Sequence, residues 1–63
     1  MNFANNLTKL LELHHLNYEQ VAAGTGFSSR AVSYWAQGKR IPNITNAQKV
    51  ADYFGVSLDS MMK

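Results

Sequence analysis

The sequence has no cysteine, one proline and only four acidic residues among its 63 residues. Without cysteine the chain can form no disulfide, no thiolate metal site and no cysteine nucleophile, which suits a reducing compartment. No apolar run approaches the roughly 20 residues that span a bilayer, and the first residues lack the layout of a signal peptide. These absences predict a cytoplasmic protein without a membrane partner.

Groups that support catalysis or metal binding are also scarce. The four acids are scattered, so no pair of carboxylates can be assigned to general acid and base roles. His14 and His15 are adjacent, which points their side chains about 100° apart on a helix, and no third ligand is evident. We therefore expect no enzymatic activity, no metal site and no cofactor, and structural roles for both histidines.

Positive charge is concentrated in the middle of the chain. The net charge is +2, and all four acids lie outside residues 20–51, a stretch that holds Arg30, Lys39, Arg40 and Lys49. A purely cationic stretch favours an anionic partner, of which nucleic acid is one class.

Apolar residues recur with the period of a helix, and period-two alternation is never sustained. The first helical pattern starts at Phe3, which Asn2 can cap. Asn17 begins a capping-box pattern that predicts a second helix over about 18–24, and a third is expected over about 29–37.

Two further helices are expected in the second half of the chain. One is closed by Gly55, and Ser57 caps the last. Five apolar residues mark the buried face of the fourth helix: Ile44, Ala47, Val50, Ala51 and Phe54. The sequence thus predicts an all-α fold, a compact five-helix bundle that forms one domain over residues 1–63.

The third predicted helix has two contrasting faces. Val32, Trp35 and Ala36 share one face and are expected in the core, so Trp35 is not expected to stack on a base. The other face carries Arg30, Ser33, Tyr34 and Gln37, and Ser29 lies in the exposed first turn.

The stretch VAAGTGFSSRAVSYW, residues 21–35, resembles the helix-turn-helix of XRE/Cro-type phage repressors. Ala22 is small where the third helix crosses it, Gly26 permits the left-handed turn, and Val32 anchors the second helix of the motif. The tail GKRIPNITNAQKVADYFGVSLDSMM also resembles the rest of this family's domain, so the resemblance covers roughly residues 3–62. It implies a lambda-repressor-like DNA-binding fold.

Two departures from the family pattern affect specific sites. Family members commonly start the second helix with a phosphate-contacting glutamine, whereas this chain has Tyr18, whose hydroxyl could reach a phosphate. Many members also bury an arginine of the first helix against a glutamate, and these positions are Leu11 and Ala36 here. Because both partners are replaced by apolar residues, no charge is stranded in the core.

The resemblance implies a double-stranded DNA-binding transcription regulator whose third helix enters the major groove. The strongest candidate base reader is Arg30, whose planar fork fits guanine O6 and N7. The full set of candidate base readers is Ser29, Arg30, Ser33 and Tyr34. Six residues are candidates for phosphate contacts: Asn17, Tyr18, Gln37, Lys39, Arg40 and Asn43.

The expected regulator is a phage or bacterial repressor, either a complete Cro-like protein or the N-terminal domain of a longer repressor. One small motif makes few base contacts, so we expect a homodimer on an inverted repeat with half-sites one DNA turn apart. Val56, Leu58 and Met62 are the candidate dimer interface, while Met61 is expected in the core.

A second class of function fits the same fold, namely a protein-interaction module such as an antirepressor or antitoxin. Only 16% of the residues are charged, and tyrosines such as Tyr18 and Tyr34 are favoured at protein interfaces. DNA binding through several phosphates weakens steeply as salt rises, whereas an apolar protein interface responds little. Salt dependence therefore separates the two hypotheses.

Overall fold

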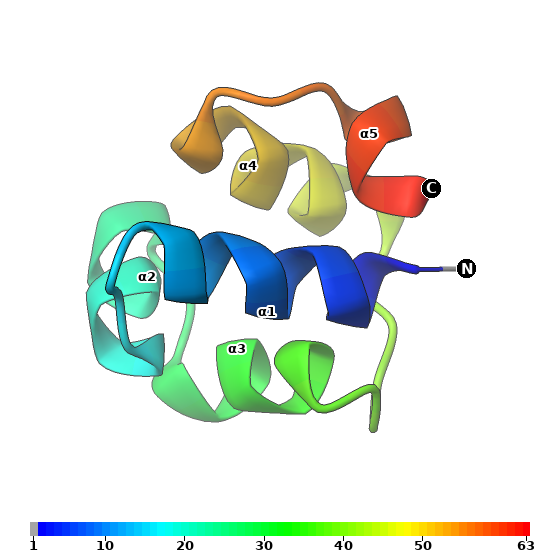
Figure 1. Cartoon of the computed structure of the whole chain (residues 1–63). Coiled ribbons are helices and arrows are strands. Elements are labelled where there is room, and N and C mark those ends of the chain that lie inside the picture. Colours follow the sequence, from blue (N-terminus) through cyan, green and yellow to red (C-terminus); the bar gives the residue numbers. More distant parts are fainter. Residues whose placement is uncertain (1) are drawn as a thin grey trace.

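The computed structural model of the chain describes residues 2–63, in which five helices are joined by short turns and no strand occurs (Figure 1). The predicted all-α, five-helix fold is confirmed. In the view of Figure 1, α1 lies between α3 and the pair formed by α4 and α5. No helix in residues 2–63 is long and apolar enough to cross a membrane. The helices are α1 (Phe3–Leu13), α2 (Tyr18–Thr25), α3 (Ser29–Ala36), α4 (Ile44–Phe54) and α5 (Leu58–Met62).

Side-chain caps begin four of the five helices. At α2 the Asn17 side chain accepts a bond from the Gln20 amide at 2.8 Å, and the Gln20 side chain accepts one from the Asn17 amide at 2.9 Å. This reciprocal pair is the predicted capping box. Ser28, Asn43 and Ser57 each accept one bond at the starts of α3, α4 and α5.

The predicted cap at Asn2 is wrong. Its side chain makes no capping bond to α1 and donates instead to the carbonyl of Lys63, at the other end of the chain. The neighbouring Asn6 side chain donates to the carbonyl of Met61 at 2.7 Å. The start of α1 is therefore tied to the C-terminal end of the chain by long-range bonds, and the backbone of Asn2, with φ −112° and ψ 25°, lacks the extended conformation typical of an N-cap.

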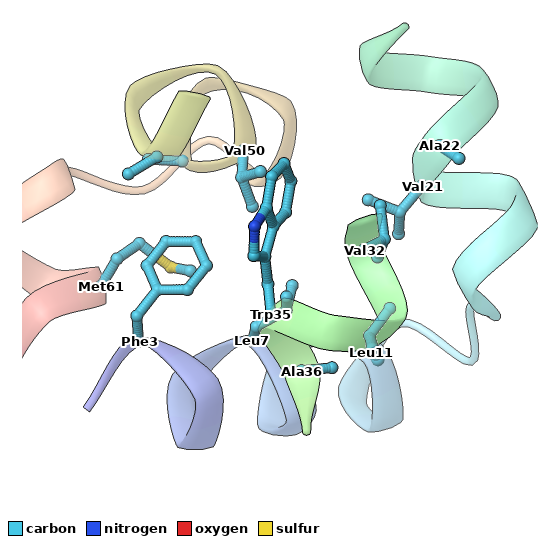
Figure 2. Close-up of a cluster of buried hydrophobic side chains, with 12 residues drawn as sticks. Phe3, Leu7, Leu11, Val21, Ala22, Val32, Trp35, Ala36, Val50 and Met61 are labelled. Atoms are coloured by element: carbon cyan, nitrogen blue, oxygen red, sulfur yellow. The ribbon is translucent and has the colours of Figure 1, made fainter. Parts of the chain in front are cut away.

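The core combines apolar side chains from all five helices, and within residues 2–63 no polar residue is buried. Trp35 is 6% exposed, and its ring meets Phe27 edge-on at 5.0 Å, which confirms its predicted core position. Leu11 and Ala36 are also buried, as expected for an apolar replacement of a buried ion pair. Figure 2 shows ten of the buried residues: Phe3, Leu7, Leu11, Val21, Ala22, Val32, Trp35, Ala36, Val50 and Met61.

One residue predicted on the buried face of α4 lies outside the core. Ile44 is 67% exposed, whereas Ala47, Val50 and Ala51 are buried. Helical side chains lean toward the N-terminus of their helix. Because Ile44 is the first residue of α4, its side chain points past the helix end and not onto a preceding turn.

The end of α1 places a histidine in a conformation that favours glycine. The Leu16 amide donates to the Leu11 carbonyl at 2.9 Å and the His15 amide to the Glu12 carbonyl at 3.3 Å, which is the Schellman pattern. His15 has φ 54°, in the left-handed region. The centroid of the adjacent His14 ring lies 5.7 Å from that of Phe54, and both histidines are exposed.

Replacing His15 with glycine is expected to stabilise the protein by about 0.5–1 kcal/mol. Glycine removes the left-handed strain of roughly 1–2 kcal/mol, and part of that gain is offset by the greater freedom of glycine in the unfolded chain. Thermal unfolding followed by circular dichroism measures the change. Gly55→Ala is the reciprocal control, because Gly55 has φ 70° at the end of α4 and an added Cβ there meets no atom within 4 Å. A gain in stability from Gly55→Ala, or a loss from His15→Gly, would contradict this assignment of strain.

Candidate nucleic-acid interface

The turn between α2 and α3 fixes the two helices against each other. Gly26 has φ 83°, and its amide donates to the Ala22 carbonyl at 2.8 Å, which ends α2 in a left-handed turn. Val21 on α2 and Val32 on α3 are fully buried, and Figure 2 shows their side chains next to each other. The polar face of α3 is therefore carried on a packed two-helix unit.

The polar face of α3 contains all the predicted base readers. Ser29 and Arg30 are exposed and Ser33 and Tyr34 are half-buried, whereas the buried residues of the helix are Val32, Trp35 and Ala36. The Gln37 side-chain amide donates to the Ser33 hydroxyl oxygen at 3.0 Å. The Ser33 hydroxyl hydrogen thus stays available for a further acceptor, while Gln37 is held along the helix.

The chain after α3 folds back toward Tyr34. Gly38 has φ 75°, and this left-handed turn lets the amides of Lys39 and Arg40 both donate to the Tyr34 carbonyl, at 2.9 and 3.4 Å. The Lys39 Nζ lies 5.9 Å from the centroid of the Tyr34 ring, and the Arg40 Cζ lies 6.0 Å from it. Two predicted phosphate contacts are therefore clustered on one residue of the predicted reading face.

A groove of about 650 Å³ separates α3 from the start of α4. It brings together Arg30 and Tyr34 from α3, Arg40 from the following turn, and Asn43 with Asn46 from the start of α4. The Asn43 side-chain oxygen caps α4, which leaves its amide group as a donor. Sequence reasoning missed Asn46, although its place three residues after the predicted phosphate contact Asn43 was a usable signal.

Four of the six predicted phosphate contacts do not line this groove: Asn17, Tyr18, Gln37 and Lys39. Asn17 and Tyr18 stand at the start of α2 and line a separate hollow of about 530 Å³ with residues of α1, among them Thr8 and Glu12. The Asn17 oxygen is engaged in the capping box, so its amide group is the part that can donate to an acceptor.

The cations near α3 have no carboxylate partner among the described residues. Within residues 2–63 the one ion pair joins Lys63 to Asp59, at 3.0 Å, on α5 and at its end. Arg30, Lys39 and Arg40 therefore keep their charge available for an anion. Across the same range there is no cluster of three metal-ligating side chains.

The residues predicted to form a dimer interface are only partly open. Val56, Leu58 and Met62 are half-buried and pack against the core. The most exposed large apolar side chains lie elsewhere: Leu13 at 71%, Ile44 at 67% and Ile41 at 66%. A second copy of the chain could therefore cover only part of each α5 side chain.

Comparison with known proteins gives the family. The helix-turn-helix family model matches residues 7–61. The chain is 31% identical over 62 residues to the HTH-type transcriptional activator BcrR of Enterococcus faecalis, in an alignment that covers 98% of this chain and 30% of that protein. No solved structure gives a significant match. The chain belongs to the XRE-type helix-turn-helix family of DNA-binding transcription regulators.

Proposed function

We propose that the chain recognises a specific double-stranded DNA sequence by placing α3 in the major groove. The observation that carries this proposal is the grouping of Arg30 on the polar face of α3 with Lys39 and Arg40 beyond its end, none of them paired with a carboxylate of residues 2–63. Arginine suits base edges through its fork, and cations clustered beside it suit phosphates. This combination supports both the reading of bases by α3 and the positioning of the protein on the DNA backbone.

The proposed roles follow from the position of each side chain. Ser29, Arg30 and Ser33 read base edges, since they share the polar face in the first turns of α3, and Tyr34 stands beside them. The phosphate contacts form two groups. One group lies at or beyond the end of α3 and consists of Gln37, Lys39, Arg40 and Asn43. The other group lies at the start of α2, where Asn17 and Tyr18 contact the DNA backbone.

The proposed assembly on DNA is a homodimer on an inverted repeat. Two-fold symmetry of the protein is matched by two half-sites one helical turn apart. The exposed parts of Val56, Leu58 and Met62 form the proposed contact between copies. We further propose that the chain is a phage or bacterial repressor, because a protein that occupies a promoter can block transcription from it. The relative from Enterococcus faecalis is named an activator and is a longer protein.

The test is selection of the purified protein against random DNA duplexes at about 50 and 200 mM salt, a range over which counterion release changes affinity strongly. We expect enrichment of an inverted repeat with half-site centres about 10 base pairs apart, and binding that weakens steeply at the higher salt. Recovery of a single half-site would contradict the dimer but not the reading of DNA. No enrichment and no salt-sensitive binding would contradict the proposed function.

One observation favours the alternative of a protein-interaction module. Ile41 and Ile44 are about two-thirds exposed on either side of Pro42 and Asn43, beside the groove. Exposed apolar side chains of this size are typical of protein contacts. If the selection fails, a partner that binds this surface should do so with little dependence on salt.

A further inference from the structure

We infer that Tyr34 is a positioning residue, which holds Lys39 and Arg40 in place for the DNA backbone and does not itself read a base. This inference rests on the proposed function and assigns Tyr34 a role different from the base reading predicted for it. It concerns the phosphate contacts that follow α3.

Two independent contacts join Tyr34 to both cations. Its carbonyl accepts the amides of Lys39 and Arg40, so the backbone of these residues is fixed relative to α3. Its ring lies within cation–π distance of both charged groups, at 5.9 and 6.0 Å. Other residues of α3 can provide a carbonyl, but only an aromatic side chain can attract two cations through its ring face.

This arrangement matters because long cationic side chains lose conformational freedom when they bind. Immobilising one such side chain weakens binding roughly 2- to 12-fold. The Tyr34 ring restricts the side-chain conformations of Lys39 and Arg40 in the free protein. Part of their conformational entropy is therefore lost on folding and not on binding DNA. The ring also offsets the mutual repulsion of two neighbouring cations, which no carboxylate among residues 2–63 relieves.

The half-buried position of Tyr34 fits this role. The ring is packed at the wall of the groove that also contains Arg30 and Arg40, so its orientation is fixed by its surroundings. Neither cation is held by a salt bridge within the described residues. The Tyr34 ring thus lies within cation–π distance of both cations at once.

The test uses Tyr34→Leu, which keeps an apolar side chain but removes the ring, and Tyr34→Phe, which keeps the ring without the hydroxyl. We expect Tyr34→Leu to weaken binding about 3- to 10-fold, by the same factor for the selected sequence and for an unrelated duplex. Tyr34→Phe should stay within about twofold of the original protein. The slope of log affinity against log salt should not change in either variant, because the same phosphates are contacted.

A double-mutant cycle separates positioning from a general effect on the fold. In a Lys39→Gln, Arg40→Gln background, the salt slope should fall by about 0.9 for each lost contact, and Tyr34→Leu should have no further effect on affinity. In the free protein, the ring should shift the side-chain protons of Lys39 and Arg40 in NMR spectra, and Tyr34→Leu should remove that shift.

The possible failures are distinguishable. A loss on Tyr34→Leu that persists in the glutamine background, or that falls on a single base-pair position, would overturn the positioning role while leaving DNA reading by α3 intact. A loss on Tyr34→Phe equal to that on Tyr34→Leu would assign the effect to the hydroxyl and also overturn it. Absence of salt-dependent DNA binding by the unmodified protein would overturn the proposed function, and this role with it.

Discussion

Replacing Arg30 with alanine is expected to relax the selected DNA sequence at one base-pair position and to leave the preference at other positions unchanged. A bidentate arginine–guanine contact contributes about 1–3 kcal/mol of discrimination against the wrong base, so the ratio of affinities at that position should fall about 5- to 150-fold. Selection from random duplexes, repeated with the variant, measures the change directly. Arg30 is exposed and has no carboxylate partner within residues 2–63, so the fold should be unaffected.

Two control variants separate base reading from charge. Arg30→Lys keeps the positive charge but has no planar fork, so it should also lose discrimination while retaining most of the affinity. Lys49→Ala removes one positive charge from α4, where its Nζ lies 5.9 Å from the Phe27 ring, and should leave the sequence preference intact. If Arg30→Ala binds the same sequences with uniformly lower affinity, Arg30 contacts a phosphate and the base-reading role is wrong.

Helix boundaries could be predicted where the signals are local. The Asn17 capping box, the Ser28 cap and the left-handed Gly55 act within a few residues, so the sequence contains the whole of each signal. Asn2 could not be assigned in this way because its side-chain nitrogen donates to the carbonyl of Lys63, which is distant in sequence. Ile44 has the right spacing for the core, and only its place at the end of a helix keeps it exposed.

The reading face of α3 could be predicted because helical period alone decides which side chains share a face. The grouping around Tyr34 could not, since it depends on the backbone path through the left-handed Gly38 and on where that turn returns the chain. The groove that adds Asn46 to Arg30 likewise requires the packing of α4 beside α3. The sequence pattern therefore predicts which residues share a face of one helix. Contacts between different helices and turns depend on how these pack in the folded chain.

Replacing Trp35 with alanine is expected to destabilise the protein by about 3–5 kcal/mol. The indole is 6% exposed among side chains from several helices, including Val50 and Phe3 (Figure 2). Its edge-on contact with Phe27 adds to the loss. A domain of this length has a total stability of roughly 3–9 kcal/mol, so the substitution removes at least about a third of that stability and should lower the unfolding midpoint strongly. Urea and thermal unfolding followed by circular dichroism provide the measurement.

The same substitution links stability to recognition, because Trp35 anchors α3, the helix that carries Arg30. The apparent affinity for DNA should fall in proportion to the folded fraction, while the selected sequence stays the same. Leu13→Ala is the matched control: this side chain is 71% exposed, and its loss should change stability by no more than about 0.5 kcal/mol. If Trp35→Ala unfolds cooperatively at nearly the original temperature, the indole does not hold α3 on the core. If instead the folded variant selects a different sequence, the orientation of α3 depends on Trp35 beyond simple stability.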